Sequence, residues 1–193
     1  LLATLLPFSV DLVLPAFPKI GQDFAASNSA VQFTFTGVTI GFAIGQLIAG
    51  PLADSIGRRR PMLILSGLHL IGSLLCFIAP SIDLFFWARL LQGIGGAGAA
   101  ILMGAIVRDL YTGGPMLTMM GRVSLISSLA PIVAPIIGSQ IVTALPWRTI
   151  FAFLVIFDTV IWLLTYKFLI ETLHRDKRRT SGLKVVMLRF KAV

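Results

Sequence analysis

Charge is scarce in this sequence: Asp, Glu, Lys and Arg together make up only 12% of the residues. An average soluble domain has about 25% charged residues. Hydrophobic residue types reach 56% here, and the mean hydropathy is +0.93. This composition excludes a disordered chain and an ordinary soluble enzyme. The single cysteine, Cys76, excludes a disulfide scaffold.

Histidine is also rare, with only His69 and His174 in the chain. The sequence shows no metal-ligand spacing and no pairing of a nucleophile with a base, so a membrane-embedded enzyme is not favoured. No cofactor or metal is predicted. His69 is interpreted as a packing residue or as a hydrogen-bonding residue between helices.

Six long stretches contain few polar residues, and they predict an all-α membrane protein. Each can cross about 30 Å of hydrocarbon as a helix, and none alternates polar and apolar residues as a membrane strand does. The predicted spans are 1–20, 31–49, 62–80, 84–107, 119–144 and 150–170. Residues 1–170 are therefore predicted to form a six-helix transmembrane half-bundle, and residues 171–193 a basic cytoplasmic tail. Because the chain starts inside an apolar run at Leu1, we expect it to be part of a larger protein.

Acidic residues are half as common as basic ones, which gives a formal net charge of +8. In a soluble chain this excess would suggest nucleic-acid binding. Here, however, thirteen of the sixteen basic residues are counted on one side, and only Lys19 and Arg148 fall in the odd connections. The thirteen lie in or next to the second and fourth connections (Arg58, Arg59, Arg60, Arg108 and Arg122) or in the tail counted together with Lys167. The positive-inside rule then predicts that both termini are cytoplasmic. The excess of positive charge is therefore interpreted as a signal that orients the spans in the lipid bilayer. The bilayer is a predicted partner, and nucleic acid is not.

Small residues form two packing patterns. Gly37, Gly41, Gly45 and Ala49 recur every four positions and predict a stripe on which another helix can pack closely. Residues 93–98 match the dinucleotide pattern G-x-G-x-x-G, but they lie inside an apolar span with no strand before them. Helix packing is therefore favoured over nucleotide binding.

Four prolines lie inside two of the predicted spans: Pro15 and Pro18 in the first, Pro131 and Pro135 in the fifth. Proline removes backbone hydrogen bonds from a membrane helix and bends it. The bent helices either line a part of the protein that moves or carry static kinks.

Three charged residues, Asp11, Arg89 and Asp158, lie within apolar spans, where a charge is costly unless it meets water or a partner. Measured from the outer end of each span, Asp11 lies about 14 Å deep and Arg89 about 9 Å deep. A long arginine side chain can bridge such a difference. The pair is interpreted as a proton-coupling site or as a permanent ion pair. Asp158 has no partner evident in the sequence.

The second connection, 50–61, predicts a tight cytoplasmic turn. Pro51 and Gly57 would bend the chain, and Asp54 would cap an adjoining helix. The three arginines that follow would meet anionic lipid headgroups.

These residues resemble motifs of the major facilitator superfamily. Its motif A is matched by Gly50, Leu52, Asp54, Gly57, Arg58 and Arg59, and its motif B by Arg89, Gln92, Gly93 and Gly95. The motif C region is matched by Ala130, Pro131, Ala134, Pro135 and Gly138. Segments 11–18, 108–111, 147–151 and 171–173 extend the likeness to the bicyclomycin-resistance branch of bacterial drug:proton antiporters. Val13 stands where that branch usually has tyrosine, and Ser139 where it usually has a second glycine.

The resemblance implies the N-terminal half, with a 3+3 inverted repeat, of a twelve-helix transporter. Such a transporter would export small amphiphilic drugs across a bacterial inner membrane in exchange for protons, by alternating access. Its partners would be the drug, protons, the bilayer, and either the missing C-terminal half or a second copy. The alternative is a truncated, non-transporting membrane fragment or a decayed gene product.

The resemblance also implies roles for individual residues. Asp11 would be a proton-responsive carboxylate, and Arg89 its electrostatic modulator. The gate of motif A would be formed by Gly50, Asp54, Gly57, Arg58 and Arg59. The helix bend of the antiporter motif would be formed by Pro131, Pro135 and Gly138.

Overall fold

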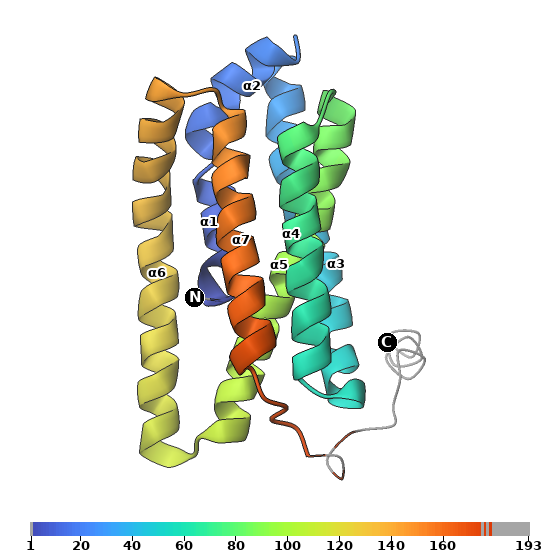
Figure 1. The fold of residues 1–193 in the computed structure, drawn as a ribbon, viewed down its shortest axis with the longest axis vertical. Coiled ribbons are helices and arrows are strands. Elements are labelled where there is room, and N and C mark those ends of the chain that lie inside the picture. Colours follow the sequence, from blue (N-terminus) through green and yellow to red (C-terminus); the bar gives the residue numbers. More distant parts are fainter. Residues whose placement is uncertain (1, 175, 177, 179–193) are drawn as a thin grey trace.

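The computed structural model describes residues 2–174, 176 and 178, and this part of the chain is all-helical (Figure 1). Six helical segments in it are long and apolar enough to cross a membrane, which confirms the predicted fold class. The elements are η1 (Leu2–Thr4), α1 (Leu5–Asp11), η2 (Leu14–Ala16), α2 (Phe17–Asp23), α3 (Asn28–Ile56), α4 (Arg59–Ile78), α5 (Ile82–Leu110), α6 (Gly113–Ala144) and α7 (Arg148–Phe168). Most of the basic tail predicted over 171–193 lies outside the described residues.

The first predicted span is interrupted and is not one continuous helix. It consists of η1, α1, η2 and α2 in succession. Pro15 stands at the start of η2, and Pro18 at the start of α2. Proline has no backbone N–H to donate and fixes its own φ, so it suits the first turn of a helix and disrupts the interior of one. The two prolines therefore divide this span into short helical pieces.

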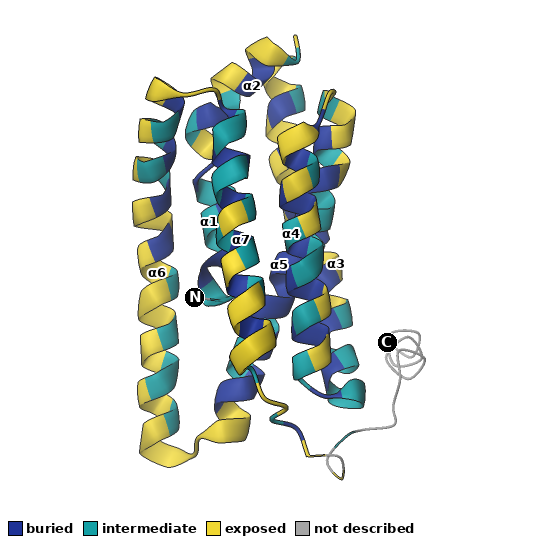
Figure 2. Ribbon diagram, in the orientation of Figure 1, coloured by how far each residue is buried: buried dark blue, intermediate teal, exposed yellow. Residues whose placement is uncertain are grey.

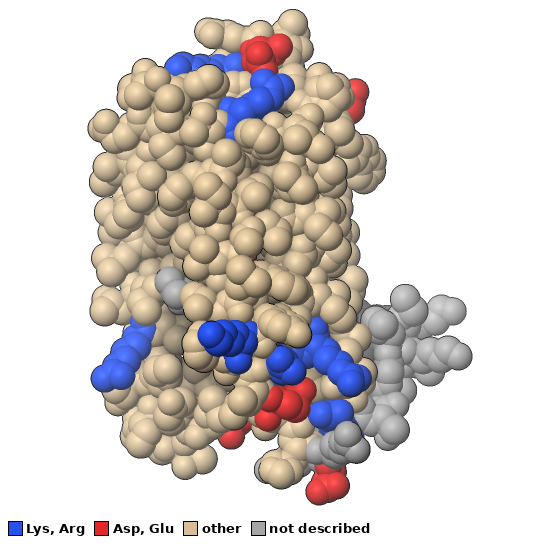
Figure 3. All heavy atoms as spheres, viewed as in Figure 1, with Lys and Arg blue, Asp and Glu red and all other residues tan. Residues whose placement is uncertain are grey.

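Successive long helices run in opposite directions, which sorts their connections between two ends of the bundle (Figure 1). We call the end formed by the α3–α4 turn, the α5–α6 turn and the segment after α7 the basic end. At the opposite end, Lys19 donates to the Val142 carbonyl, and Arg148 pairs with Asp23. Figure 3 shows charged side chains gathered towards the two ends of the visible face, with a band of other residues between them. This is the distribution expected of a protein that crosses a hydrocarbon layer.

Helix α5 lies at the centre of the bundle and packs most extensively on α3 and α4. Glycines permit this close approach. A Cβ atom at Gly41 would overlap the Leu90 carbonyl, and a Cβ at Gly93 would overlap the Val38 carbonyl. Both glycine patterns are thus packing surfaces between helices, as predicted.

Helix α6 lies at the edge of the bundle, and most of its surface is exposed (Figure 2). Its buried residues recur every four positions and form one stripe: Ala130, Ala134, Gly138 and Val142. Gly138 lets the helix approach the backbone of Leu12 closely. The helix continues without a break through Pro131 and Pro135. Its remaining apolar surface suits contact with lipid.

The close contact between α3 and α5 gives a first prediction. Gly41→Ala would place a methyl group against backbone, where nothing flexible can move aside. We expect it to destabilise the protein by about 1–3 kcal/mol, seen as a lower midpoint of thermal unfolding in detergent. Gly121→Ala is the matched control, because Gly121 lies within α6 with open space around its Cα. An equal loss of stability in both variants would show that the α3–α5 contact is not tightly packed.

Candidate functional site

A chain of hydrogen-bonded polar groups crosses the interior of the bundle from α1 to α7. Every side chain in it is at most 2% exposed. Its members are Ser9, His69, Ser73, Arg89, Gln92 and Asp158. We call this set the buried polar chain. Buried polar groups that are connected in this way stabilise a specific arrangement of helices.

Arg89 holds the α1 side of the buried polar chain. Its Nη1 donates to the backbone carbonyl of Ser9 at 2.8 Å and to Gln92 Oε1 at 2.7 Å. Its guanidinium carbon lies 5.9 Å from the centre of the Phe151 ring. The Nε and Nη2 atoms are buried without a hydrogen-bond partner among the described residues. A permanently charged group therefore sits in the core without direct contact to a carboxylate there.

Asp158 holds the α7 side of the buried polar chain. Its Oδ2 accepts from Ser73 Oγ at 2.6 Å and lies 2.9 Å from His69 Nδ1. Gln92 Nε2 donates to Ser73 Oγ at 2.7 Å and so joins the two sides. These partners of Asp158 were not evident from the sequence, because they lie 85 and 89 residues away on another helix. His69 proves to be a hydrogen-bonding residue between helices, one of the two interpretations left open.

The structure does not bring Asp11 and Arg89 together. Arg89 instead binds the carbonyl of Ser9, two residues before Asp11. Residues two apart on a helix point in roughly opposite directions, so the turn that brings Ser9 to Arg89 carries Asp11 away from it. The Asp11 carboxylate is half-buried and has neither a hydrogen bond nor an ion pair with any described residue.

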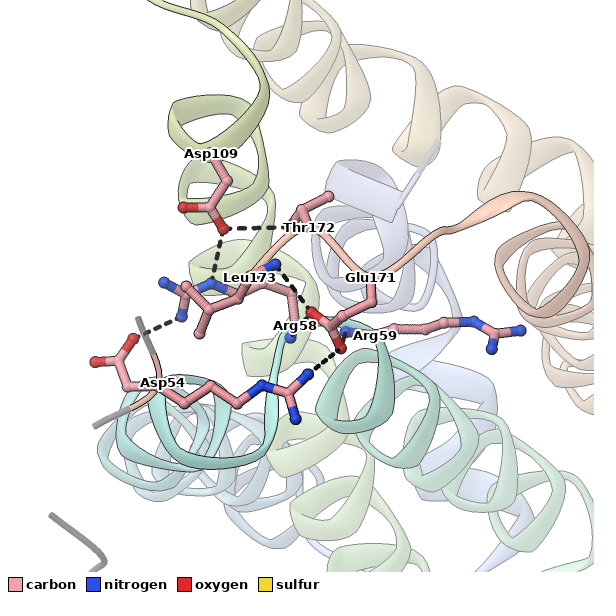
Figure 4. Close-up of polar contacts among 8 residues, drawn as sticks. Asp54, Arg58, Arg59, Asp109, Glu171, Thr172 and Leu173 are labelled. Carbon is pink, nitrogen blue, oxygen red and sulfur yellow. Dashed lines mark hydrogen bonds and ion pairs between the residues drawn. The ribbon is translucent and has the colours of Figure 1, made fainter. Parts of the chain in front are cut away.

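Charged side chains at the basic end form a second cluster, which joins four parts of the chain (Figure 4). Arg58 bridges two carboxylates: its Nη1 lies 2.6 Å from Asp54 Oδ1, and its Nε lies 3.0 Å from Asp109 Oδ2. Thr172 Oγ1 donates to the same Asp109 oxygen at 3.2 Å. The end of α3, the α3–α4 turn, the end of α5 and the segment after α7 are thereby held together.

Glu171 caps the start of α4. Its carboxylate accepts from the backbone N–H of Arg58 at 2.7 Å and from that of Arg59 at 3.4 Å. No side chain of α4 or its own N-cap residue provides this bond. The first N–H groups of a helix lack partners within it and favour a negative charge. Glu171 satisfies them from 113 residues further along the chain.

The same contacts set the protonation of two groups in this cluster. Partial burial of Arg58 would lower its pKa, but its bonds to Asp54 and Asp109 hold that pKa above the ordinary value. Partial burial of Glu171 would raise its pKa, but backbone N–H groups of Arg58, Leu173 and Arg59, with the charge of Arg178, hold that pKa below the ordinary value. The cluster therefore consists of ion pairs at neutral pH.

Most of motif A is helical, which corrects the predicted turn over 50–61. Helix α3 continues through Gly50 and Pro51 to Ile56, and Asp54 lies in its last turns rather than capping α4. Gly57, with a φ of 101°, is the residue that ends the helix. A positive φ is easily adopted by glycine and disfavoured for other residues. The turn is therefore only two residues long, Gly57 and Arg58.

A cavity of about 370 Å³ lies between the first segment and helices α3, α5 and α6. Its walls are almost entirely apolar, and its few polar side chains are serines of α6. The lining residues include Leu6, Pro7, Phe42, Gly96, Met103, Met120, Ser124 and Ser127. Asp11 does not line it but lies one helical turn beyond Pro7, on the same face of α1.

Six antiparallel spans with charged clusters at their ends and a polar chain inside define a multi-pass membrane protein. The family model of the Major Facilitator Superfamily matches residues 1–191. The chain belongs to the Major Facilitator Superfamily, whose members are transporters and not enzymes.

Relatives place the chain more closely within this family. It is 41% identical over 186 residues to a Bacillus subtilis protein named uncharacterized MFS-type transporter YdgK, covering 95% of this chain and 46% of the relative. It is 34% identical to the bicyclomycin resistance protein homolog of Haemophilus influenzae, covering 98% and 48%. It is 31% identical to the multidrug resistance protein MdtL of Salmonella paratyphi C, covering 93% and 47%. The chain spans about half the length of the curated relatives it matches.

Solved structures agree with this fold. The human organic anion transporter MFSD10 (TETRAN) matches with a TM-score of 0.73 and 25% identity, over 100% of this chain and 54% of that one. The xylose transporter XylE of E. coli, in a partially occluded inward-open conformation, matches with a TM-score of 0.68 and 18% identity, over 99% and 55%. The second likeness concerns the fold alone.

Gly57 gives a second prediction. Gly57→Ala would force a positive φ on alanine and push its Cβ into the Glu171 carboxylate. We expect a loss of about 1–2 kcal/mol in the free energy of unfolding, measured by circular dichroism during heating. Gly50→Ala is the control within the same motif, because Gly50 is helical with open space around it, and alanine there is expected to be neutral or to stabilise by up to about 1 kcal/mol. Equal effects of the two substitutions would contradict the strain at Gly57.

Glu171 gives a third prediction, on pH. Because its pKa is lower in the folded protein than its ordinary value of 4.5, its stabilisation is fully present above that pH. The stabilisation is lost as the pH falls further, through the folded value. Glu171→Gln should therefore melt at a lower temperature than the parent at pH 7, and the difference should vanish under strongly acidic conditions. A difference that stays constant with pH would show that the carboxylate charge does not hold the cap.

Proposed function

We propose that the chain is one half of a proton-driven exporter of small amphiphilic molecules, located in a bacterial inner membrane with both termini cytoplasmic. The carrying observation is the pairing of an apolar cavity with a half-buried carboxylate, Asp11, on the same face of α1. The drug-resistance names of two relatives support the export of drugs. The thirteen basic residues predicted on one side support the orientation, with the basic end facing the cytoplasm.

The cavity suits an amphiphilic substrate. Its walls offer apolar surface with very few fixed polar groups, so they select by shape and hydrophobicity rather than by hydrogen bonds. Met103 and Met120 are flexible side chains that adapt to different occupants. In transporters built from two halves, the substrate site lies between the halves. A second six-helix half, or a second copy of this chain, would therefore close the cavity.

Asp11 suits a proton carrier. A carboxylate that has no fixed partner can bind and release a proton as its surroundings change. Alternating exposure to the two sides of the membrane would change those surroundings. Arg89 would act on Asp11 indirectly, through the α1 backbone that it holds at Ser9.

The other predicted residues fit a moving half-bundle. Around the α3–α4 turn, Arg58 bridges Asp54 and Asp109 of α5, and Arg59 donates to the Tyr166 carbonyl of α7. Together with Gly50 and Gly57, these residues would form the gate, so this end would move as one body when the gate opens. Pro131, Pro135 and Gly138 would shape a bend of α6 that opposes leakage. Gly138 lies on the Leu12 backbone, where a gap would allow leakage.

Dye efflux tests the proposal and gives a fourth prediction. We would measure ethidium transport in inverted vesicles that hold either this chain alone or this chain joined to the second half of the Haemophilus relative. The joined protein should accumulate ethidium when the vesicle interior is acidic, and an ionophore that collapses the pH gradient should stop it. Asp11→Asn should retain ethidium binding but lose at least about tenfold of gradient-driven transport.

Asp83→Asn serves as the matched control, because Asp83 lies in the first turn of α5, away from the cavity lining. Transport by the chain alone would favour pairing of two copies. Absence of gradient-driven transport in both arrangements, with folded protein present in the membrane, would favour a non-transporting fragment. Unchanged transport in Asp11→Asn would leave that carboxylate without a coupling role.

A further inference from the structure

His69 and Asp158 form a titratable couple deep inside the bundle. The imidazole is 0% exposed and the aspartate residue 2%. One carboxylate oxygen, Oδ2, receives both contacts, from His69 Nδ1 and from Ser73 Oγ. The other oxygen, Oδ1, and the second imidazole nitrogen, Nε2, are buried without a partner among the described residues. Asp158 Oδ1 and His69 Nε2 are therefore the two atoms of this pair that could accept a further hydrogen.

Charge balance favours an ionised Asp158. Arg89 is permanently positive and fully buried, and an apolar interior disfavours an uncompensated charge. Asp158 is the carboxylate connected to Arg89, through Ser73 and Gln92. With His69 neutral, the three groups sum to zero. The imidazole then donates its Nδ1 hydrogen to the carboxylate and leaves Nε2 as a bare acceptor.

One added proton upsets this balance. Binding to His69 Nε2 forms an imidazolium beside the carboxylate, and the buried polar chain as a whole becomes positive. Because Gln92 and Arg89 share a hydrogen bond, the change acts on the group that holds the α1 backbone at Ser9. The structure thus connects a proton on α4 to the position of the broken first span.

One edge of the imidazole lies close to a residue that lines the apolar cavity, although His69 itself is fully buried. A Cβ atom placed on Gly96 would lie 3.4 Å from His69 Cδ2, the ring atom bonded to Nε2. Gly96 itself lines the cavity, beside Leu6. The Leu6 side chain lies closer still, with its Cδ1 at 2.9 Å from that Cβ position, so the imidazole edge is separated from the cavity by the backbone of Gly96 and the movable side chain of Leu6.

Few other charges face the couple. Helix α5 contributes Arg89, and α4 contributes Cys76, a buried thiol within electrostatic range of that arginine. Helix α1 contributes the Ser9 carbonyl, with Asp11 turned away from Arg89. On α7, the nearest titratable groups along the chain are Tyr166 and Lys167, two turns nearer to the basic end. The protonation of the couple is therefore governed by its own two members and by Arg89.

We propose that His69 and Asp158 form a proton-binding site, entered from the cavity past Gly96 when the Leu6 side chain moves, whose occupancy sets the charge of the buried polar chain. This site is distinct from Asp11. Its part in transport rests on the proposed function, but its proton binding does not.

Nuclear magnetic resonance of the histidine ring tests the site directly. The chain has only two histidines, so His174→Gln leaves His69 as the single imidazole. With ¹⁵N-labelled histidine and the full chain in lipid nanodiscs, we expect Nδ1 to carry the hydrogen at high pH and Nε2 to gain one as the pH falls. Histidine changes charge at about pH 5–8. A ring that keeps one protonation state throughout that range would overturn the proposal.

Two variants should shift the midpoint of this titration in opposite directions. Asp158→Asn removes the adjacent negative charge and should lower the midpoint by about 1–3 pH units. Ser73→Ala removes a hydrogen bond that stabilises the carboxylate anion and should raise it. Thr165→Val is the matched control, because Thr165 is buried on α7 but bonds only within its own helix. Should Asp158→Asn fail to fold, Ser73→Ala and Thr165→Val still decide the question: an equal midpoint in both would overturn the proposal.

Ethidium transport in the joined protein separates this site from the proposed function. If the couple mediates proton exchange, the pH profile of transport moves with the midpoint in each variant. Opposite midpoint shifts without any gradient-driven transport would support the site and contradict the proposed function. Gradient-driven transport with the same pH profile in both variants as in the parent would support the proposed function. It would also show that the His69–Asp158 pair takes no part in transport.

Discussion

A permanent positive charge inside an apolar bundle is the constraint on which much of this structure depends. Arg89 cannot lose its charge, and no carboxylate among the described residues touches it, so it depends on the Ser9 carbonyl of α1 and on Gln92 of its own helix. Through Gln92 it is linked to Ser73 of α4 and to Asp158 of α7. Gly72 of α4 lies against the backbone of Gln92 and so permits the close approach that joins Ser73 to Gln92. At the α4–α5 contact, close helix packing and the hydrogen bonds of the buried polar chain therefore depend on each other.

The two polar clusters differ in how they are built. At the basic end, Arg58 lies directly between two carboxylates, near water, where each contact contributes modestly and can be remade. In the core, opposite charges are separated by Gln92 and Ser73, and each group depends on its neighbour for a hydrogen-bond partner. The first arrangement suits a surface that opens and closes. The second connects α4 and α7 to α1, so a change of charge at the His69–Asp158 pair would act on the first span.

The sequence predicted the spans, the family and the packing role of the glycines, because composition and spacing along one helix carry those features. It also placed Asp11 and Arg89 at similar depths, since depth follows from counting residues. It could not supply the rotation of each helix about its axis, which decides that Ser9 and not Asp11 meets Arg89. Contacts such as Asp158 with His69, or Glu171 with Arg58, join residues far apart in the chain and left no local signal. The continuation of α3 through Pro51 was missed because proline usually marks a turn.

The cap that Glu171 places on α4 also concerns the order in which the protein is made. The start of α4 is synthesised 113 residues before the carboxylate that satisfies its N–H groups. At about 5–20 residues per second, this delay is about 6–23 seconds. During that interval the four spans α4 to α7 are synthesised. Until Glu171 emerges, the α3–α4 turn is held by its own residues and, once α5 is complete, by Asp109. When the segment after α7 emerges, Glu171 can bind the start of α4. The contact that fixes the turn between the second and third spans therefore forms only after the last span has been made.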